Sequence, residues 1–215
     1  MRLLFKSCLI LTVFFTTLGA VVSYADIELP APRKEGGIGV LEPLNRRGSA
    51  PGSSFSSMKI SDEDLSTILW AATGPNRDGA KWTVPMAMGV PPYVKIYAVL
   101  ENGAFLYDWK EHKLKEIVAE DARTKIGAQA FVASAPCSLV FVSDGEALME
   151  KFKNEDAAKH LAGVATGAMT QNIYLAAAAL DLNVRYVQSV KADEVRSLFK
   201  LDKTDLPICL VLLGK

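Results

Sequence analysis

Residues 165–180 constrain the fold more than any other stretch of this sequence. The alanine run at 177–179 favours a helix, and apolar residues surround the helix axis instead of forming a single stripe. A helix that is apolar all round must be covered on every side. The sequence therefore predicts a long central helix that is buried within a domain.

Small and polar residues stand where we expect this helix to begin. They are Thr166, Gly167, Thr170, Gln171 and Asn172. Because a helix start exposes backbone N–H groups, these residues could cradle a polar ligand. They could equally do no more than cap and solvate the first turn. The sequence leaves both interpretations open.

The first 25 residues have the pattern of a secretory signal peptide. Arg2 and Lys6 give a basic start, residues 9–18 are apolar apart from threonines, and small residues precede Asp26. The apolar run is shorter than the roughly 20 residues of a membrane-spanning helix. We therefore expect a cleaved signal over residues 1–25, no stable membrane anchor after cleavage, and a periplasmic or secreted location. An uncleaved anchor is the alternative.

The mature chain is long enough for one domain with its own core. The full chain has 24 basic and 24 acidic residues, of which the signal carries two basic ones, so the mature protein is close to neutral and has no concentrated basic stripe. This balance argues against nucleic acid as a partner. Cys137 and Cys209 lie in apolar stretches, which predicts buried strand residues and not a metal site. Whether they pair is left open.

Beyond the signal, the chain divides into an arm and a domain. Residues 26–57 are rich in Pro, Gly and Ser and predict an extended arm with a short helical turn at 40–47. Residues 58–215 predict a domain in which helices and strands interleave without βαβ repetition. We expect helices at 61–73, 121–129, 144–161, 165–180 and 192–199. We expect a hairpin of 93–100 with 104–107, and residues 114–118 either extend it or begin the next element. We expect buried strands at 138–142, 184–190 and 207–213. The fold class is therefore α+β, with a mixed, largely antiparallel sheet flanked by helices and a long central buried helix.

Most enzyme templates are missing from the sequence. It has two histidines, His112 and His160, both in charged contexts typical of the surface. It has no nucleophile elbow, phosphate-binding P-loop, dinucleotide glycine fingerprint or metal-ligand spacing. What remains is a set of cations and polar donors far apart in the chain: Arg46, Arg47, Ser49, Gly167, Gln171, Asn172 and Lys215. Flavin mononucleotide (FMN) needs such a set, with cations for its phosphate and donors around the polar edge of its ring.

Several stretches taken together resemble the nitroreductase family of FMN enzymes. Residues 65–77, Leu-Ser-Thr-Ile-Leu-Trp-Ala-Ala-Thr-Gly-Pro-Asn-Arg, are similar to that family's Leu-Leu-Trp-Ala-Ala-x-Gly-x-Asn-Arg signature. Further similar pieces lie at 27–32, 36–37, 46–47, 83–85, 96–97, 105–108, 120–123, 166–167 and 171–175. The similarity extends over essentially the whole mature chain, and it points to the exported branch related to the SagB-type dehydrogenases of bacteriocin maturation.

The resemblance implies a homodimer with one FMN at each end of the interface and the central helix near that interface. It implies two-electron reduction of a nitroaromatic, quinone or similar small-molecule acceptor, for which a nicotinamide is a compatible electron donor. The cofactor-binding residues that it implies are Arg46, Arg47, Ser49, Pro85, Met86, Ala87, Gly167, Gln171 and Asn172. No side chain is assigned as a catalytic residue or a metal ligand, because the chemistry would reside in the cofactor.

Three segments depart from the family pattern. Where the family's phosphate motif reads Arg-Arg-Ser-x-Arg, this chain has Arg-Arg-Gly-Ser-Ala at 46–50. Where the family has Pro-Ser-Ala-x-Asn-x-Gln, this chain has Pro-Met-Ala-Met-Gly-Val-Pro at 85–91. The family's Val-Arg-Gly is replaced by Tyr-Val-Gln at 186–188. A second function therefore stays open: an exported nitroreductase-fold pseudo-enzyme that has lost flavin and acts as a dimeric binding or accessory protein. Its apolar cleft would be lined by Trp82, Met86, Met88 and Tyr93.

Overall fold

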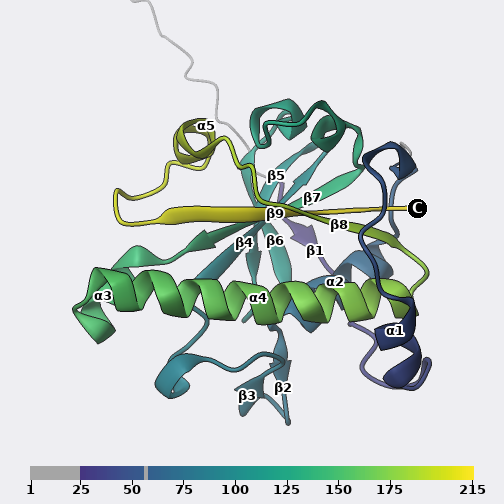
Figure 1. The fold of residues 1–215 in the computed structure, drawn as a ribbon, viewed down its shortest axis with the longest axis horizontal. Helices are drawn as coiled ribbons and strands as arrows, with labels where there is room; N and C mark the ends of the chain where they lie inside the picture. Colours follow the sequence, from purple (N-terminus) through teal and green to yellow (C-terminus); the bar gives the residue numbers. More distant parts are fainter. Residues whose placement is uncertain (1–24, 56–57) are drawn as a thin grey trace, which may run out of the picture.

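The protein is built on one large antiparallel sheet (Figure 1). The computed structural model describes residues 25–55 and 58–215, so the predicted signal peptide lies outside the described residues apart from Ala25. The sheet has seven strands in the order β1-β6-β5-β4-β7-β9-β8. Their bounds are β1 Ile27–Glu28, β4 Val94–Leu100, β5 Gly103–Asp108, β6 Lys113–Val118, β7 Cys137–Ser143, β8 Asn183–Val187 and β9 Leu206–Gly214. Every pairing between them is antiparallel, which confirms the α+β class and makes the sheet more uniform than a mixed one.

The predicted hairpin forms the middle of the sheet. β4 pairs with β5 so that Leu100 lies opposite Gly103, where the backbone has a φ of 156° that favours glycine. β6 continues the meander on the far side of β5. Of the two alternatives for residues 114–118, extension of the hairpin is therefore the one that occurs.

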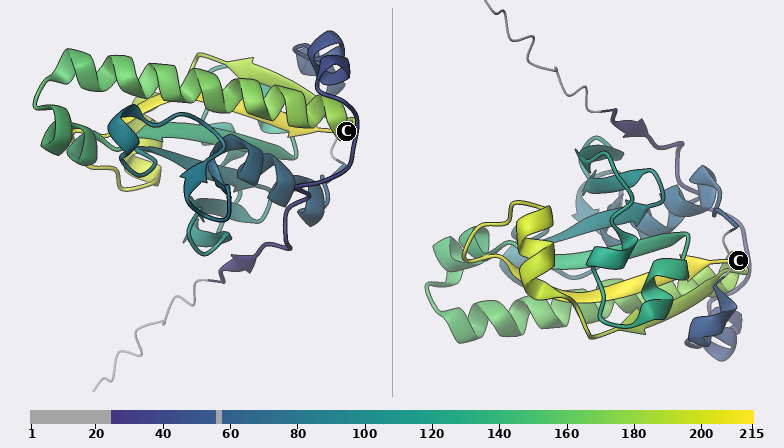
Figure 2. Two further views of the ribbon diagram at one scale, coloured as in Figure 1. Left: turned by 90° about the horizontal axis from the view of Figure 1, so that it is seen from below. Right: turned by 90° about the horizontal axis from the view of Figure 1, so that it is seen from above.

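Helices and turns cover both faces of the sheet (Figure 2). Alternate residues of β4 separate into two cores: Ile96 packs in the cluster of α2 (Asp62–Thr73) and α4 (Glu155–Ala179), and Tyr97 packs in the opposite one. The opposite cluster is covered by α5 (Ala192–Leu198) and by the 3₁₀ turns η3 (Arg123–Lys125) and η4 (Ala130–Ser134). Both faces of the central strands are thus buried, which explains their continuous apolar sequences.

The central helix begins ten residues earlier than residue 165, at Glu155, and runs to Ala179. Asn154 caps it, since its side-chain oxygen accepts from the backbone N–H of Ala157. The surface helix expected at 144–161 is instead split between α3 (Gly145–Phe152) and the first turns of α4. The split lies at Lys153, whose left-handed φ of 51° ends α3.

This longer helix corrects the predicted cradle. Residues 166–172 lie in the middle of α4, where the backbone N–H groups already bond within the helix. No helix start is therefore available to a ligand there, and any contact must come from the side chains.

The remaining elements are short. They are α1 (Leu41–Arg46), the 3₁₀ turns η1 (Gly52–Ser54) and η2 (Ala87–Gly89), and a ribbon of β2 (Pro75–Asn76) with β3 (Lys81–Trp82). The helix expected at 121–129 is wrong beyond the single turn of η3. There the Asp121 carboxylate accepts from the backbone N–H of Arg123 and pairs with its guanidinium, which fixes a local turn and not a longer helix. Cys137 and Cys209 are buried and unpaired.

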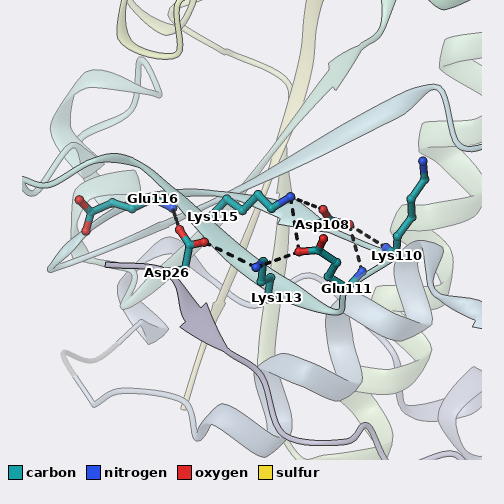
Figure 3. Close-up of polar contacts among 7 residues, drawn as sticks. All are labelled: Asp26, Asp108, Lys110, Glu111, Lys113, Lys115 and Glu116. Atoms are coloured by element: carbon teal, nitrogen blue, oxygen red, sulfur yellow. Dashed lines mark hydrogen bonds and ion pairs between the residues drawn. The ribbon is translucent and has the colours of Figure 1, made fainter. Parts of the chain in front are cut away.

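Ion pairs and hydrogen bonds fasten the start of the arm to the sheet (Figure 3). The Asp26 carboxylate accepts from the backbone N–H of Glu116 and pairs with Lys113. Lys113 and Lys115 also share Glu111. These contacts dock β1 on β6, so the arm belongs to the fold from Asp26 onward. Within the described ranges no helix is long and apolar enough to cross a bilayer.

Candidate functional site

The arm returns to the domain where α4 passes edge strand β8. The backbone N–H of Ala50 donates to the Val184 carbonyl at 2.8 Å, and Arg185 donates to the Ala50 carbonyl at 2.8 Å. Just before this point, Ser49 Oγ lies 2.7 Å from the hydroxyl of Tyr174, a residue of α4. Ser49 and Tyr174 are 125 residues apart in the chain. The fold thus brings the arm, with its two arginines, against the central helix.

A hollow of about 530 Å³ opens at this meeting point. We call it the α4–β8 hollow. It is lined by Arg47 and Ser49 of the arm, by Gly163, Thr166, Gly167, Thr170, Gln171 and Tyr174 of α4, and by Tyr186, Gln188 and Ile208. Its volume lies in the range of small-molecule sites. Four of the predicted cofactor-binding residues therefore come together here: Arg47, Ser49, Gly167 and Gln171.

The two adjacent arginines have different surroundings. Arg46 pairs with Glu42 at 3.4 Å and with Asp181 at 3.0 Å. The guanidinium of Arg47 instead stacks over the ring of Tyr174, 4.2 Å from its centroid, and it has no acidic partner among residues 25–55 and 58–215. Its positive charge is therefore free to meet an anion in the α4–β8 hollow.

Two threonines that line the same hollow have buried hydroxyl groups without a partner in the described residues. Thr166 is only 3% exposed, and its hydroxyl has no hydrogen-bond partner within the described part of the chain. The Thr170 hydroxyl is also buried and unpartnered there. Buried polar groups of this kind are costly unless something bonds them. A methyl group placed on Gly163 or Gly167 would meet nothing within 4 Å. There is therefore room beside the helix for a ligand that could bond these hydroxyls.

The other predicted residues do not join this hollow. The Asn172 amide donates to the carbonyls of Ala71 and Thr83 at 3.0 and 3.2 Å, which ties α4 to α2. Pro85, Met86 and Ala87 lie in the segment before β4, where Ala87 begins η2, and Met86 and Ala87 pack beside the core shared by α2 and α4. Arg46 lines a neighbouring hollow with Asp181, and Lys215 lies 3.6 Å from Asp64. One chain therefore does not bring the whole predicted set together.

Tyr174, Gly163 and Ile208 line this hollow although the sequence analysis did not single them out, and Tyr174 makes the contacts with the arm. It sits among apolar residues of α4 and therefore looks like an ordinary core side chain. Tyr186 and Gln188 were visible only as departures from the family pattern, and both line the hollow. Nearby, burial raises the pKa of Cys209 to about 12, so its thiol stays protonated near neutral pH and offers no nucleophile.

Comparisons with known proteins agree on the family. A sequence profile described as the nitroreductase family matches residues 52–215. A candidate nitroreductase of Methanocaldococcus jannaschii is 26% identical over 170 residues, which cover 75% of this chain and 84% of that protein. The crystal structure of a candidate nitroreductase from Ralstonia eutropha JMP134 has a TM-score of 0.80 and 29% identity, covering 88% of this chain and 89% of that one.

A more distant neighbour shares the fold. The NADPH:FMN oxidoreductase of Vibrio harveyi, solved in complex with NAD⁺, has a TM-score of 0.61 at 21% identity and covers 81% of this chain and 67% of that one. The family profile spans well over half of the chain and ends at its last residue. From this match, and from the fold that carries it, the chain belongs to the nitroreductase family.

Proposed function

We propose that the protein is an FMN-dependent oxidoreductase of the nitroreductase type, which carries out the two-electron reduction of a nitroaromatic, quinone or similar acceptor. The proposal rests on the surroundings of the Arg47 side chain. A guanidinium without an acidic partner in the described residues is held over Tyr174. It lines a hollow whose two threonines have hydroxyls that also lack a partner there. These groups fit a ligand with an anionic end and polar edges, which describes FMN.

Seven of the lining residues have a part in holding such a ligand. Arg47 would bind the phosphate, with Ser49 beside it. Gly163 and Gly167 leave space along α4, while Thr166, Thr170 and Gln171 would bond the polar edge of the ring. Bound FMN would supply the redox chemistry, taking two electrons from a donor such as a nicotinamide and passing them to the acceptor. The protein's own contribution would be binding and orientation.

We further propose that the working unit is a homodimer. The α4–β8 hollow is open, and the outward face of α4 beside it carries Gly163, Gly167 and the 54% exposed Val164. An exposed apolar and small-residue strip in the middle of a central helix suits contact with a second copy. Asn172 and residues 85–87 lie away from the hollow of their own chain, so a partner subunit is the available source of further contacts to a bound flavin.

A titration with FMN tests the cofactor, and the adjacent arginines provide a matched pair of variants. Arg47→Ala should raise the dissociation constant about tenfold to a hundredfold, because a charge-assisted hydrogen bond contributes about 1.5–3 kcal/mol. Arg46→Ala should have a smaller effect, because Glu42 and Asp181 already occupy its guanidinium. Quenching of flavin fluorescence measures both. An affinity that Arg47→Ala leaves unchanged would show that the phosphate does not bind at Arg47.

One observation favours the alternative function, a pseudo-enzyme that has lost flavin. Asn172, which the family resemblance assigns to the cofactor, is already bonded to two backbone carbonyls of its own chain. If the purified protein is colourless and neither binds added FMN nor quenches its fluorescence, the oxidoreductase proposal is overturned. The protein would then be a dimeric binding or accessory protein on the same scaffold.

We also propose that the protein is exported to the periplasm or secreted, as a member of the SagB-related branch. The support is the basic, apolar and small-residue pattern of residues 1–25 together with the docking of Asp26, the first residue after the predicted cleavage site. N-terminal sequencing of protein recovered from the cell envelope or the medium should begin at Asp26. Recovery only from the cytoplasm, with the first residues retained, would contradict export.

A further inference from the structure

Tyr174 lies where the arm, α4 and β8 meet. The residue is only 2% exposed, and it also lines the α4–β8 hollow. Its hydroxyl accepts from the backbone N–H of Tyr186 at 2.7 Å and lies 2.7 Å from Ser49 Oγ. Its ring carries the Arg47 guanidinium. One buried phenol thus contacts both polar residues that the arm brings to the site.

The direction of the bond to Ser49 follows from proton counting. The Tyr174 oxygen already accepts from Tyr186, and its own proton needs an acceptor because the group is buried. Ser49 Oγ is the only acceptor within reach in the described residues. Tyr174 therefore donates to Ser49, which leaves the Ser49 proton directed to an acceptor outside this pair. A serine held in this way is a donor for an anion in the α4–β8 hollow.

The arm does not depend on Tyr174 for its docking. The next residue, Ala50, is bonded to Val184 through its N–H and to Arg185 through its carbonyl. Loss of the phenol hydroxyl would therefore leave the arm in place. It would release the Ser49 hydroxyl from its orientation and leave the backbone N–H of Tyr186 without this acceptor. Loss of the ring would in addition release Arg47, because a guanidinium over an aromatic face is held by its attraction to the ring.

We infer that Tyr174 is a positioning residue for the proposed cofactor site, where its hydroxyl orients Ser49 and its ring orients Arg47 toward an anionic group. This inference rests on the proposed function, because it names what prepares the phosphate end of that site. The segment 46–50 lacks one hydroxyl and one arginine of the family pattern. The contacts of Tyr174 explain how Arg47 and Ser49 in this segment are still arranged for an anion.

A double-mutant cycle on the full chain tests the coupling, with FMN and inorganic phosphate as separate probes. Tyr174→Phe and Ser49→Ala should each weaken binding about threefold to tenfold, the range that one neutral hydrogen bond gives. The double variant should bind no more weakly than Ser49→Ala alone, because the Tyr174 hydroxyl acts on the anion only through Ser49. Tyr174→Leu should weaken binding further, because it also removes the ring beneath Arg47.

Controls separate positioning from stability. Tyr97→Phe removes the hydroxyl of a buried tyrosine on the other face of the sheet, where it stacks on Phe199, and should leave both affinities unchanged. Thermal melts of all variants report folding apart from binding. Additive effects of Tyr174→Phe and Ser49→Ala, or an unchanged affinity in Tyr174→Phe, overturn the inference. If the wild type binds phosphate but not FMN, the proposed function alone fails and the phosphate cycle decides on Tyr174; if it binds neither, both are overturned.

Discussion

His112 joins three segments of the chain through its two ring nitrogens. Its Nδ1 lies 2.9 Å from the Tyr107 hydroxyl, and its Nε2 lies 2.8 Å from Ser66 Oγ, which donates to the Pro30 carbonyl. Since Ser66 gives its proton to Pro30, the proton of the second bond must sit on Nε2, and Nδ1 accepts from Tyr107. The neutral ring therefore links the arm, α2 and the turn after β5. A surface role, which the charged sequence context suggested, is wrong for this residue.

The stability of the protein should depend on the protonation of His112. Burial lowers the pKa of His112 below the ordinary value of 6.5, Lys34 acts in the same direction, and the nearby Pro30 carbonyl opposes them. The unfolded chain therefore takes up this proton more readily than the folded protein. Stability should fall as the pH drops from about 6.5 through the lowered pKa of the folded state. Urea unfolding at about pH 7.5 and about pH 5 measures this loss.

The variant His112→Asn isolates the effect. Asparagine accepts the left-handed backbone at this position, where φ is 52°, and it does not titrate. The variant should be less stable than the wild type at about pH 7.5, by about 1–2 kcal/mol for two lost hydrogen bonds, and it should lose less on going to about pH 5. His160→Asn changes an exposed histidine of α4 and should behave as the wild type does. An equal pH dependence in wild type and His112→Asn would rule out this role.

At the scale of the elements, the sequence predicts the end of a helix or strand correctly where neighbouring residues mark that end. Ser61 accepts from the backbone N–H of Asp64 at the start of α2, and Gly74 follows its last residue, as the pattern indicates. The turn at Glu101 and Asn102 fixes the β4–β5 hairpin in the same way. In each case a few neighbouring residues decide the structure, so no knowledge of distant contacts is needed.

The start of α4 could not be predicted because its surroundings change along its length. The first turns carry exposed charged residues such as Glu155 and Lys159, and the later turns are buried against α2 and the sheet. One continuous helix therefore has two hydrophobic patterns, and the change of pattern looks like a boundary. Figure 1 shows it as a single rod across the front of the sheet.

The same geometry explains why only some of the predicted site residues lie around one hollow. Gly167 and Gln171 lie four residues apart and share one side of α4, which is the side of the hollow. Asn172 follows Gln171 directly, but one residue turns the helix by roughly 100°, so its amide reaches α2 instead. Which side of the helix the arm would meet depends on the pairing of Ala50 with Val184, and no local pattern encodes that contact.

At the scale of the whole molecule, the sheet is covered on both faces but the central helix is not covered on all sides. α4 contacts α2 and the sheet through its buried residues, while Gly163, Val164 and Gly167 face outward near the middle of its length. The all-round apolar pattern of residues 165–180 predicted a helix enclosed on every side. A single chain leaves this strip open, and the second copy that we propose would cover it.

Val164→Arg tests that dimer. Val164 does not line the α4–β8 hollow, so its substitution leaves the proposed cofactor contacts of its own chain unchanged. If two α4 helices meet along this strip, the variant would bury an unpaired charge, at a cost of several kcal/mol. Sedimentation velocity should then show a dimer for the wild type and a monomer for the variant, and the variant's affinity for FMN should fall with the loss of the partner. Glu150→Arg, an exposed substitution in the last turn of α3, should remain dimeric. A monomeric wild type at micromolar concentration, or a dimeric Val164→Arg, would show that this face of α4 is not the interface.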